Sequence, residues 1–275
     1  MRSASAAVRA SVSGFSLVEL AIVLFIVGLL MLGLMSTLSS QIEQRNFDDT
    51  RRRLEQAREL VLASAIVNGR LPCPARSNSA GAEVRNLAGE CKNTSGTIVE
   101  DHYGGTLSDG TVGGLLPAVT IGFQPVDSAG FAVDAWGNRI RYAVAKTITG
   151  CGGTPPHFVH AANLKTNGIT CLPFDLLICS VTQAVAAGNA CSAGTAVTNK
   201  EVVAAIVFST GKNGNLGPQG SNETENVNGQ GTVNRVFVSK TPDPAGVATG
   251  EFDDLLVWIP AGVLYGKLIA AGVLP

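Results

Sequence analysis

Residues 14–42, which read GFSLVELAIVLFIVGLLMLGLMSTLSSQI, decide the architecture of this chain. Over residues 20–42 no side chain is charged, and this run exceeds the roughly 20 apolar residues that a helix needs to cross a bilayer. The stretch therefore predicts a membrane-spanning helix. Glu19 stands just inside the apolar segment, where a carboxylate in hydrocarbon costs about 3 kcal/mol. Glu19 is thus either a functional residue with a partner or an inert, solvated group at the level of the lipid headgroups.

Residues 1–14 are typical of a targeting leader, because they carry Arg2 and Arg9, no acid and mostly small side chains. The apolar run behind them is longer than the h-region of about 7 to 15 residues found in an ordinary secretory signal. We therefore expect a leader over residues 1–14 that is not part of the fold.

Beyond the apolar run the sequence is highly charged but keeps a helical spacing of apolar side chains. The sequence at 68–69, Asn-Gly, is a typical helix stop, and Pro72 prevents continuation. We therefore expect one helix over about residues 16–67, with residues 15–69 forming a transmembrane and stalk segment. The apolar positions, which recur at steps of mostly three, four or seven, are Ile42, Phe47, Leu54, Ala57, Val61, Ser64 and Ala65.

Three consecutive arginines at 51–53 in this helix have two interpretations. They contact lipid phosphates or a nucleic acid, or they lie on a solvated helix face with ion pairs such as Arg51 with Glu55. The chain has 20 Lys+Arg against 21 Asp+Glu, a balance that is not typical of a nucleic-acid binder. Charge alone therefore identifies no partner, and nucleic acid remains an open alternative.

Residues 70–275 form the predicted globular head, because the pattern changes to short apolar runs between Gly, Asn, Ser and Pro clusters. No run is followed by a long helical pattern, so we expect an α+β fold in which an antiparallel sheet with long loops packs on the helix. The apolar tail over residues 261–275 is too short for a second span and is expected to pack on the head or to form a contact surface. The predicted strands cover residues 139–146, 157–161, 174–180, 202–209, 233–239 and 254–259.

Six cysteines, an even number, all lie beyond residue 70, and no two of them form a CxxC motif. This pattern is typical of disulfides in an oxidising compartment, whereas six reduced thiols packed as small hydrophobes in a cytosolic domain are the alternative. Each bond between sequence neighbours would contribute roughly 3 kcal/mol in the chain-entropy model. Short loops favour the pairs Cys73 with Cys91, Cys151 with Cys171, and Cys179 with Cys191.

Composition indicates a folded domain with an apolar segment, and the motifs give no positive support for catalysis. With 45% apolar and 15% charged residues the chain is not of the disordered class. His157 and His160 lack the H-E-x-x-H spacing of a zinc protease, and we expect them to be surface histidines. The loop around Lys212 lacks the first Gly and the Ser or Thr of a P-loop, and no G-x-S-x-G motif is present. We therefore expect no enzymatic activity.

The chain resembles the type IV pilins and the type II secretion pseudopilins, whose precursors carry a Gly, then F-[ST]-L-[IV]-E, then an apolar helix. Residues 14–20, GFSLVEL, match that signature without a mismatch. Two positions depart from the pattern of many members, because Ser36 stands where they have Pro and Ser13 where they have a basic residue. Three head segments are similar more loosely, namely DAWGNR at 134–139, FSTGKNG at 208–214 and DDLLVW at 253–258.

The resemblance implies a processing step and an assembly role. Prepilin peptidase would cut between Gly14 and Phe15, Phe15 would become the N-methylated amino terminus, and the apolar helix would stay in the mature chain. Glu19 would pair with the terminal amine of a neighbouring subunit. An unpaired charge in an apolar filament core is strongly unfavourable, so this pair would set the axial register.

The function that the resemblance implies is that of a minor pilin or pseudopilin, a structural subunit of a type IV pilus or a type II secretion pseudopilus with a pilin-like fold. Its partners would be other pilin or pseudopilin subunits, prepilin peptidase, the inner-membrane assembly platform and membrane lipid. Its location would be the bacterial inner membrane, in a single pass with the head in the periplasm, and then the filament. The alternative is a membrane-anchored periplasmic binding protein or enzyme with an uncleaved signal anchor.

The resemblance also implies a candidate metal site. Major pseudopilins carry calcium in the loop that corresponds to residues 210–228 here. Calcium takes six to eight oxygen ligands, commonly several carboxylates. This loop offers Asn213, Asn215, Glu223 and Glu225 as ligands, so calcium is the one cofactor considered. The alternative is a mobile Gly- and Asn-rich loop without a metal.

Overall fold

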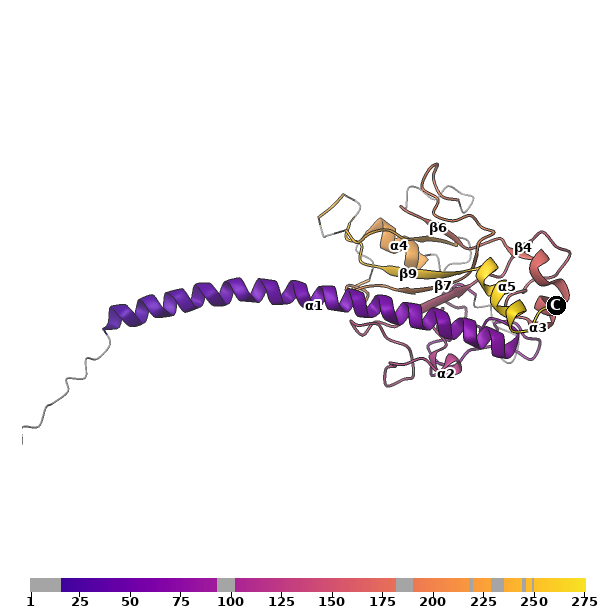
Figure 1. Ribbon diagram of the computed structural model, residues 1–275, viewed down its shortest axis with the longest axis horizontal. Helices are drawn as coiled ribbons and strands as arrows, with labels where there is room; N and C mark the ends of the chain where they lie inside the picture. The colour runs from indigo at the N-terminus through magenta and orange to yellow at the C-terminus, as the bar shows by residue number, and fades with distance from the viewer. Residues whose placement is uncertain are drawn as a thin grey trace, which may run out of the picture. The chain divides into compact units, whose positions relative to one another are not determined.

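The chain divides into two compact units, Met1–Arg45 and Asn46–Pro275. The leader predicted over residues 1–14, with the processing residues Gly14 and Phe15, lies outside the described part. The side chains of residues 32–39 and 228 are likewise not described. The computed structural model describes residues 16–92, 102–181, 190–217, 220–228, 235–243, 246–248 and 250–275 (Figure 1).

Helix α1 spans Leu17–Asn68, in agreement with the helix expected over about residues 16–67. Gly69 ends it with a φ of +67°, in the left-handed region that favours glycine, and the N–H of Arg70 donates to the carbonyl of Ala65 over 3.1 Å. Among the residues that the structure describes, no helix combines the length and the hydropathy of a membrane span. The predicted span over residues 20–42 stays a prediction.

Within the unit Asn46–Pro275, one face of α1 packs into the core of the head. Phe47 is partly buried and meets Trp136 edge-on, with ring centroids 4.9 Å apart, whereas Ile42, in the other unit, is exposed. Full burial of one Leu or Val side chain is worth about 1.5 to 3 kcal/mol, so this face holds the helix firmly against the head. The buried apolar positions are Leu54, Ala57, Val61 and Ala65, as predicted, together with Leu62.

The head is built around a three-stranded antiparallel sheet in the order β3-β7-β9 (Figure 1). Strand β3 covers Arg141–Val144, β7 covers Val203–Ser209 and β9 covers Leu255–Pro260. Strand β7 is buried along its whole length, which agrees with its uninterrupted apolar sequence VAAIVFS. Its pairing with β3 and β9 on either side makes it the centre of the core.

Smaller ladders surround this sheet, and one of them is parallel, in addition to the antiparallel sheet that the sequence predicts. Strands β6 (Leu177–Cys179) and β8 (Val236–Val238) pair in parallel. The chain between them passes through β7 and helix α4 (Ser221–Asn228), a crossover of the length that parallel pairing requires. The antiparallel ladders pair β1 (Gly105–Thr106) with β2 (Val112–Gly113) and β4 (Ile148–Thr149) with β5 (Leu172–Pro173).

The strand predicted over residues 157–161 is wrong. His160 ends that stretch as the cap of helix α3 (Ala161–Asn167), because its Nδ1 accepts the N–H of Asn163 over 3.4 Å. The remaining predicted ranges contain β3, β6, β7 and β8, each shorter than expected, whereas β9 is as long as its predicted range and begins one residue later. Residues 233–234 lie outside the described part. The other short helices are α2 (Ala118–Ile121), η1 (Gly168–Thr170) and α5 (Ala261–Ala270).

The apolar tail packs on the head, as expected. Helix α5 buries Leu264, Tyr265 and Leu268 in the same core that α1 and β7 form. The hydroxyl of Tyr265 donates to the carbonyl of Cys171, which joins the tail to a disulfide loop. All three predicted disulfides are confirmed, since the structure pairs Cys73 with Cys91, Cys151 with Cys171, and Cys179 with Cys191.

The segment DAWGNR at 134–139 forms a tight turn that joins α1 to β7. Asp134 Oδ1 accepts the N–H of Asn138 over 2.8 Å, and Gly137 has a φ of +86°, which only glycine adopts readily. Ser209 Oγ donates to Asp134 Oδ2 over 2.5 Å, and Arg53 on α1 donates to the Asp134 carbonyl over 2.7 Å. Burial raises the pKa of Asp134, and these hydrogen bonds oppose the shift. The turn therefore contacts the sheet through the Asp134 carboxylate and the helix through the Asp134 backbone carbonyl.

Candidate functional site

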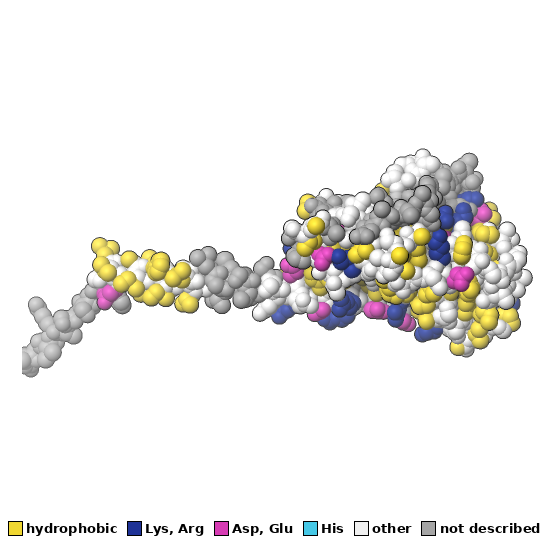
Figure 2. Space-filling model, turned by 90° about the horizontal axis from the view of Figure 1, so that it is seen from above, with side chains coloured by type: hydrophobic (Ala, Val, Ile, Leu, Met, Phe, Trp, Pro, Cys, Tyr) yellow, Lys and Arg dark blue, Asp and Glu magenta, His cyan; other side chains and the backbone are white. Residues whose placement is uncertain are grey.

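The part of α1 that lies in the unit Met1–Arg45 presents apolar side chains to solvent. Every large apolar side chain described between Leu17 and Met31 is exposed, from 42% for Val27 to 86% for Leu17. The visible face of this segment is covered by hydrophobic side chains (Figure 2). An apolar surface of this extent marks a contact site for protein or lipid.

Glu19 closes a capping box at the start of α1. The N–H of Ser16 donates to Glu19 Oε2 over 2.9 Å, and the N–H of Glu19 donates to Ser16 Oγ over 3.2 Å. Two amide donors at the helix start, which have no partner within the helix, are thereby satisfied by each other's side chains. The exposed Glu19 carboxylate has one fixed partner in its own chain, and its position is set by the helix start.

A second cluster of functional groups gathers where α4 meets the start of β9. Glu223 on α4 and the adjacent residues Asp253 and Asp254 hold carboxylate oxygens within 4.8 Å of one another. None of the three side chains is more than 4% exposed. Three acids from two distant parts of the sequence thus share one buried position.

Hydrogen bonds from the Gly- and Asn-rich loop hold these acids in place. Glu223 Oε1 accepts the side-chain amide of Asn213 over 3.0 Å and the N–H of Asp253 over 3.1 Å. Asp253 Oδ2 accepts the N–H groups of Lys212 over 3.0 Å and of Asn213 over 3.2 Å. Asp253 Oδ1 is buried and accepts no hydrogen bond from the described residues. One oxygen of the cluster is therefore left without a donor.

Glycine is required beside that oxygen. Gly211 has a φ of +61°, and a Cβ on it would lie 2.0 Å from Asp253 Oδ1. The backbone of the loop therefore approaches the carboxylate as closely as only a residue without a side chain allows. This contact explains why the segment FSTGKNG at 208–214 has glycine at position 211.

Burial and the charges of neighbouring acids raise the pKa of Asp253 and of Asp254. Burial raises the pKa of Asp253 to about 7, and the charge of Glu223 adds to the shift. Burial likewise raises the pKa of Asp254 well above its ordinary value, although a hydrogen bond from Asn226 over 2.7 Å opposes this. Three buried carboxylates cannot all carry full charge at low cost unless a proton or a cation is shared among them.

The donor set of this cluster fits a hard divalent cation. All the side-chain atoms that converge are carboxylate oxygens, which suit Ca²⁺ or Mg²⁺ and not a metal that prefers sulfur or nitrogen. The oxygen of Asp253 without a donor is an additional point in favour. Glu223, Asp253 and Asp254 are the residues that would hold such an ion.

The structure brings together part of the predicted calcium set. Asn213 and Glu223 meet in the cluster, but Asn215 is exposed and Glu225, although buried, is not one of the converging acids. Sequence reasoning missed Asp253 and Asp254 as ligands. In the sequence they are two adjacent acids directly before an apolar strand. A carboxylate buried beside such a strand needs a partner, and this is the feature that could have identified them.

His157 and His160 are not the surface pair that the sequence predicts. His157 is fully buried, and its Nε2 lies 3.1 Å from the hydroxyl of Tyr265. Burial lowers the pKa of His157 to about 4, so it is neutral at physiological pH. His160 caps α3, as described above, and both histidines have structural roles.

Comparison with protein-family models, with curated proteins and with solved structures finds no match for this chain. Its function therefore has to be inferred from the apolar helix with its capped carboxylate and from the acidic cluster.

Proposed function

We propose that this chain is a structural subunit of a filament, a minor pilin or pseudopilin of a type IV pilus or a type II secretion pseudopilus. The observation that carries the proposal is an apolar helix segment, exposed along Leu17 to Met31, that begins with a carboxylate held in a capping box. Lipid covers this segment before assembly, and the equivalent helices of other subunits cover it in the filament. The mechanism is packing and not turnover.

Processing by prepilin peptidase is compatible with the cap. Cleavage between Gly14 and Phe15 leaves the N–H of Ser16 as an ordinary amide, because Phe15 still precedes it. The hydrogen bonds between Ser16 and Glu19 therefore survive in the mature chain. The new, methylated amine then stands one residue before the capping box.

Glu19 keeps enough acceptor capacity for a neighbouring subunit. An ionised carboxylate has about four lone-pair sites, and the capping box uses one of them, on Oε2. The other sites accept the terminal amine of the next subunit, so the capping box orients the group that forms the contact between subunits. Removing one partner of such a buried pair costs about 3 to 5 kcal/mol. A subunit in a different axial register would leave Glu19 without the amine, so that register is disfavoured by this free energy.

The head, residues 70–275, faces the periplasm and then the exterior of the filament. Three disulfides staple it, and such bonds persist in oxidising compartments. Prepilin peptidase, the inner-membrane assembly platform and other subunits are the partners of the N-terminal segment. Calcium bound by Glu223, Asp253 and Asp254 would hold the loop of Asn213 against the start of β9 as a structural ion.

The test separates charge from capping at position 19. Glu19→Gln keeps a side chain that closes a capping box, whereas Glu19→Ala removes both the cap and the charge. We expect both variants to be processed after Gly14 and to fail in filament assembly, because the pair with the neighbouring amine needs the charge. Gly14→Ala is the control that blocks processing. The N-terminus is read by mass spectrometry, and assembly by the amount of protein in sheared filaments.

Two outcomes would contradict the proposal. An N-terminus other than N-methyl-Phe15 on the native protein would favour a signal anchor that is never cleaved, with the head as a periplasmic binding protein or enzyme. Assembly of Glu19→Gln at the wild-type level, with failure of Glu19→Ala alone, would mean that Glu19 acts only as a helix cap.

A further inference from the structure

Strand β9 leaves one edge of the central sheet open. The N–H groups of Tyr142 and Val144 on β3 point away from β7 and donate to the carbonyls of Gly114 and His102, so the β3 edge is covered. On the opposite edge, the described residues provide no strand beyond β9 (Leu255–Pro260). The β3 edge therefore has backbone partners, whereas the β9 edge has no neighbouring strand among the described residues.

The register identifies the backbone groups on this open edge. The N–H of Ala145, the residue after β3, donates to the carbonyl of Ala204 on β7. Backbone groups alternate in direction along a strand, so those of Ala205 and Val207 point toward β9. Their partners are Ile259 and Val257. The N–H and C=O groups alternate along a strand, so those of Leu256 and Trp258 point outward, and no described residue accepts or donates there. These groups are a template for another strand.

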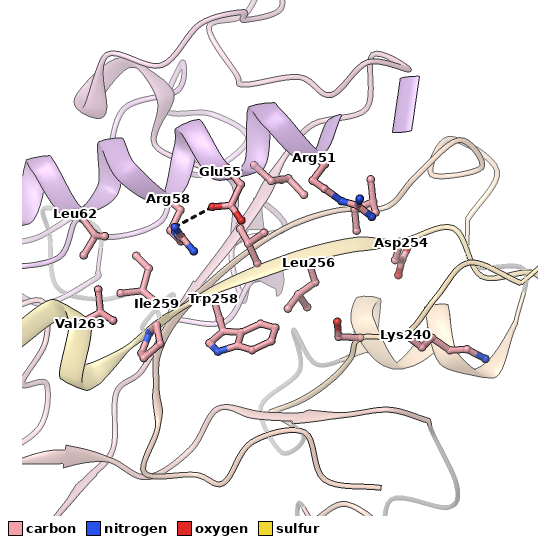
Figure 3. Close-up of a pocket in the computed structure, with 15 residues that line it drawn as sticks. Arg51, Glu55, Arg58, Leu62, Lys240, Asp254, Leu256, Trp258, Ile259 and Val263 are labelled. Carbon is pink, nitrogen blue, oxygen red and sulfur yellow. Dashed lines mark ion pairs between the residues drawn. The ribbon is translucent and has the colours of Figure 1, made fainter. Parts of the chain in front are cut away.

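A groove runs along this edge with a volume of about 520 Å³ (Figure 3). Helix α1 forms one wall with Arg51, Glu55 and Arg58, and Ser239 and Lys240 contribute to the opposite side. The outward edge of β9 lies between the walls. The groove is therefore placed where an added strand would lie.

The two walls differ in chemistry. On the α1 side Glu55 is paired with Arg58 over 3.0 Å, not with Arg51 as the helical spacing suggested, so the exposed Arg51 has no ion-pair partner among the described residues. On the other side Leu256 and Trp258 point away from α1 and are only partly buried (Figure 3). Lys240 is paired with Asp243. Among the described residues, the α1 side thus offers a cation without an ion-pair partner, and the other side offers an apolar surface beside the paired Lys240.

We propose that the β9 edge binds an extended segment of another polypeptide by strand addition, with acidic side chains facing α1 and apolar side chains facing Leu256 and Trp258. Successive side chains of a strand point to opposite faces, so a segment of alternating acidic and apolar residues matches both walls at once. Arg and Trp, the residue types at the two walls, are enriched among residues that dominate binding energy. This inference is independent of the filament role of α1.

The test uses the full-length protein in detergent micelles and short peptides of alternating valine and glutamate. We expect the glutamate peptide to slow hydrogen exchange at the amides of Leu256 and Trp258. A peptide of alternating valine and lysine should bind roughly tenfold more weakly, equivalent to about 1.4 kcal/mol. A glutamate peptide with N-methylated amides cannot pair with a strand edge and should not protect these amides.

Matched variants locate the binding to the edge and to the cation. Leu256→Pro removes an outward N–H without removing a bond to β7 and should abolish binding, whereas Leu256→Ala keeps that N–H and serves as its control. Arg51→Glu should remove the preference for the glutamate peptide, and Arg52→Glu, whose side chain does not line the groove, should leave it unchanged.

Three results would overturn the proposal. Equal binding of the N-methylated and unmodified peptides to the unaltered protein would exclude strand addition, whether or not Leu256→Pro folds. Equal affinity for glutamate and lysine peptides would exclude the role of Arg51. Protection of Leu256 and Trp258 without peptide, lost on dilution, would mean that a second copy of this chain occupies the edge.

Discussion

Replacing Asp253 by Asn should stabilise the head at alkaline pH when no divalent cation is present, and should abolish its response to calcium. Asp253 is 4% exposed and shares its position with Glu223 and Asp254. Burial, and then the charge of Glu223, raises the pKa of Asp253 from 3.8 to about 7. Asn keeps an acceptor oxygen for the N–H groups of the loop but carries no charge.

The sign of the effect follows from linkage between protonation and folding. An acid with a higher pKa in the folded state holds its proton more tightly there, so the free energy of unfolding falls as the pH rises from about 4 to about 7. At about 1.4 kcal/mol for each pKa unit, the difference between 3.8 and about 7 corresponds to on the order of 4 kcal/mol. Roughly 3 kcal/mol of this loss in the free energy of unfolding occurs above about pH 5.

His157 opposes this trend in the wild-type protein. Its pKa is lowered from 6.5 to about 4 by burial, so the unfolded chain binds the proton more readily and the free energy of unfolding falls as the pH drops through this window. The two effects overlap and partly cancel. The quantity to measure is therefore the difference between wild type and Asp253→Asn, in which the contribution of His157 is absent.

The assay is urea unfolding of the full-length protein in micelles between about pH 5 and about pH 8, with a chelator or with calcium. With chelator, the advantage of Asp253→Asn over wild type should grow by roughly 3 kcal/mol across this range. Calcium at about 100 times its dissociation constant should stabilise wild type by about 2.7 kcal/mol and leave the variant unchanged. Glu201→Gln, which neutralises an exposed acid, is the control and should follow wild type.

A pH-independent difference between wild type and Asp253→Asn in chelator would refute the raised pKa. An equal calcium response in both chains would refute the cation site while leaving the titration intact. The two readouts therefore test the electrostatics and the metal separately.

Three further changes have defined outcomes. Gly211→Ala should destabilise the head by about 2 kcal/mol more than Gly217→Ala in chemical denaturation, because both glycines have positive φ but only the first has a carboxylate oxygen 2.0 Å from the added Cβ. Replacing Cys151 and Cys171 together by Ser should lower the free energy of unfolding by roughly 3 kcal/mol in the same assay. Ser16→Ala should weaken the helix start by about 1 kcal/mol, seen as faster hydrogen exchange in the first turn of α1, with processing unchanged.

The features that the sequence predicts correctly depend on residues close together in the chain. The helix and its stop at Gly69 follow from spacing over a few turns, and the disulfide pairs follow from short loops. The capping box was equally accessible, since Ser16 and Glu19 stand three residues apart in the pattern S-x-x-E.

The acidic cluster could be predicted only in part, because its members come together through the sheet. Asn213 and Glu223 belong to one loop and the helix behind it, and their chemistry was accessible. Asp253 reaches them only because β9 pairs with β7, so that the residues before β9 lie beside the loop that follows β7. The sequences of two apolar strands do not indicate that these strands pair. They therefore do not indicate which acids the pairing brings together.

The same limit applies to the open edge of the sheet, and it bears on the inferred binding surface. The runs VAAIVFS and LLVWIP are both apolar without alternation, so the sequence gives no reason to place one at the centre and the other at an edge. An apolar edge strand invites pairing with other chains, and proteins usually protect such edges with charge, proline or a covering segment. Here Pro260 protects only the end of β9, and the backbone donors of Leu256 and Trp258 have no acceptor among the described residues. Among the described residues, this edge keeps open backbone groups beside a cation without an ion-pair partner, and the proposed binding of an acidic, extended segment rests on that arrangement.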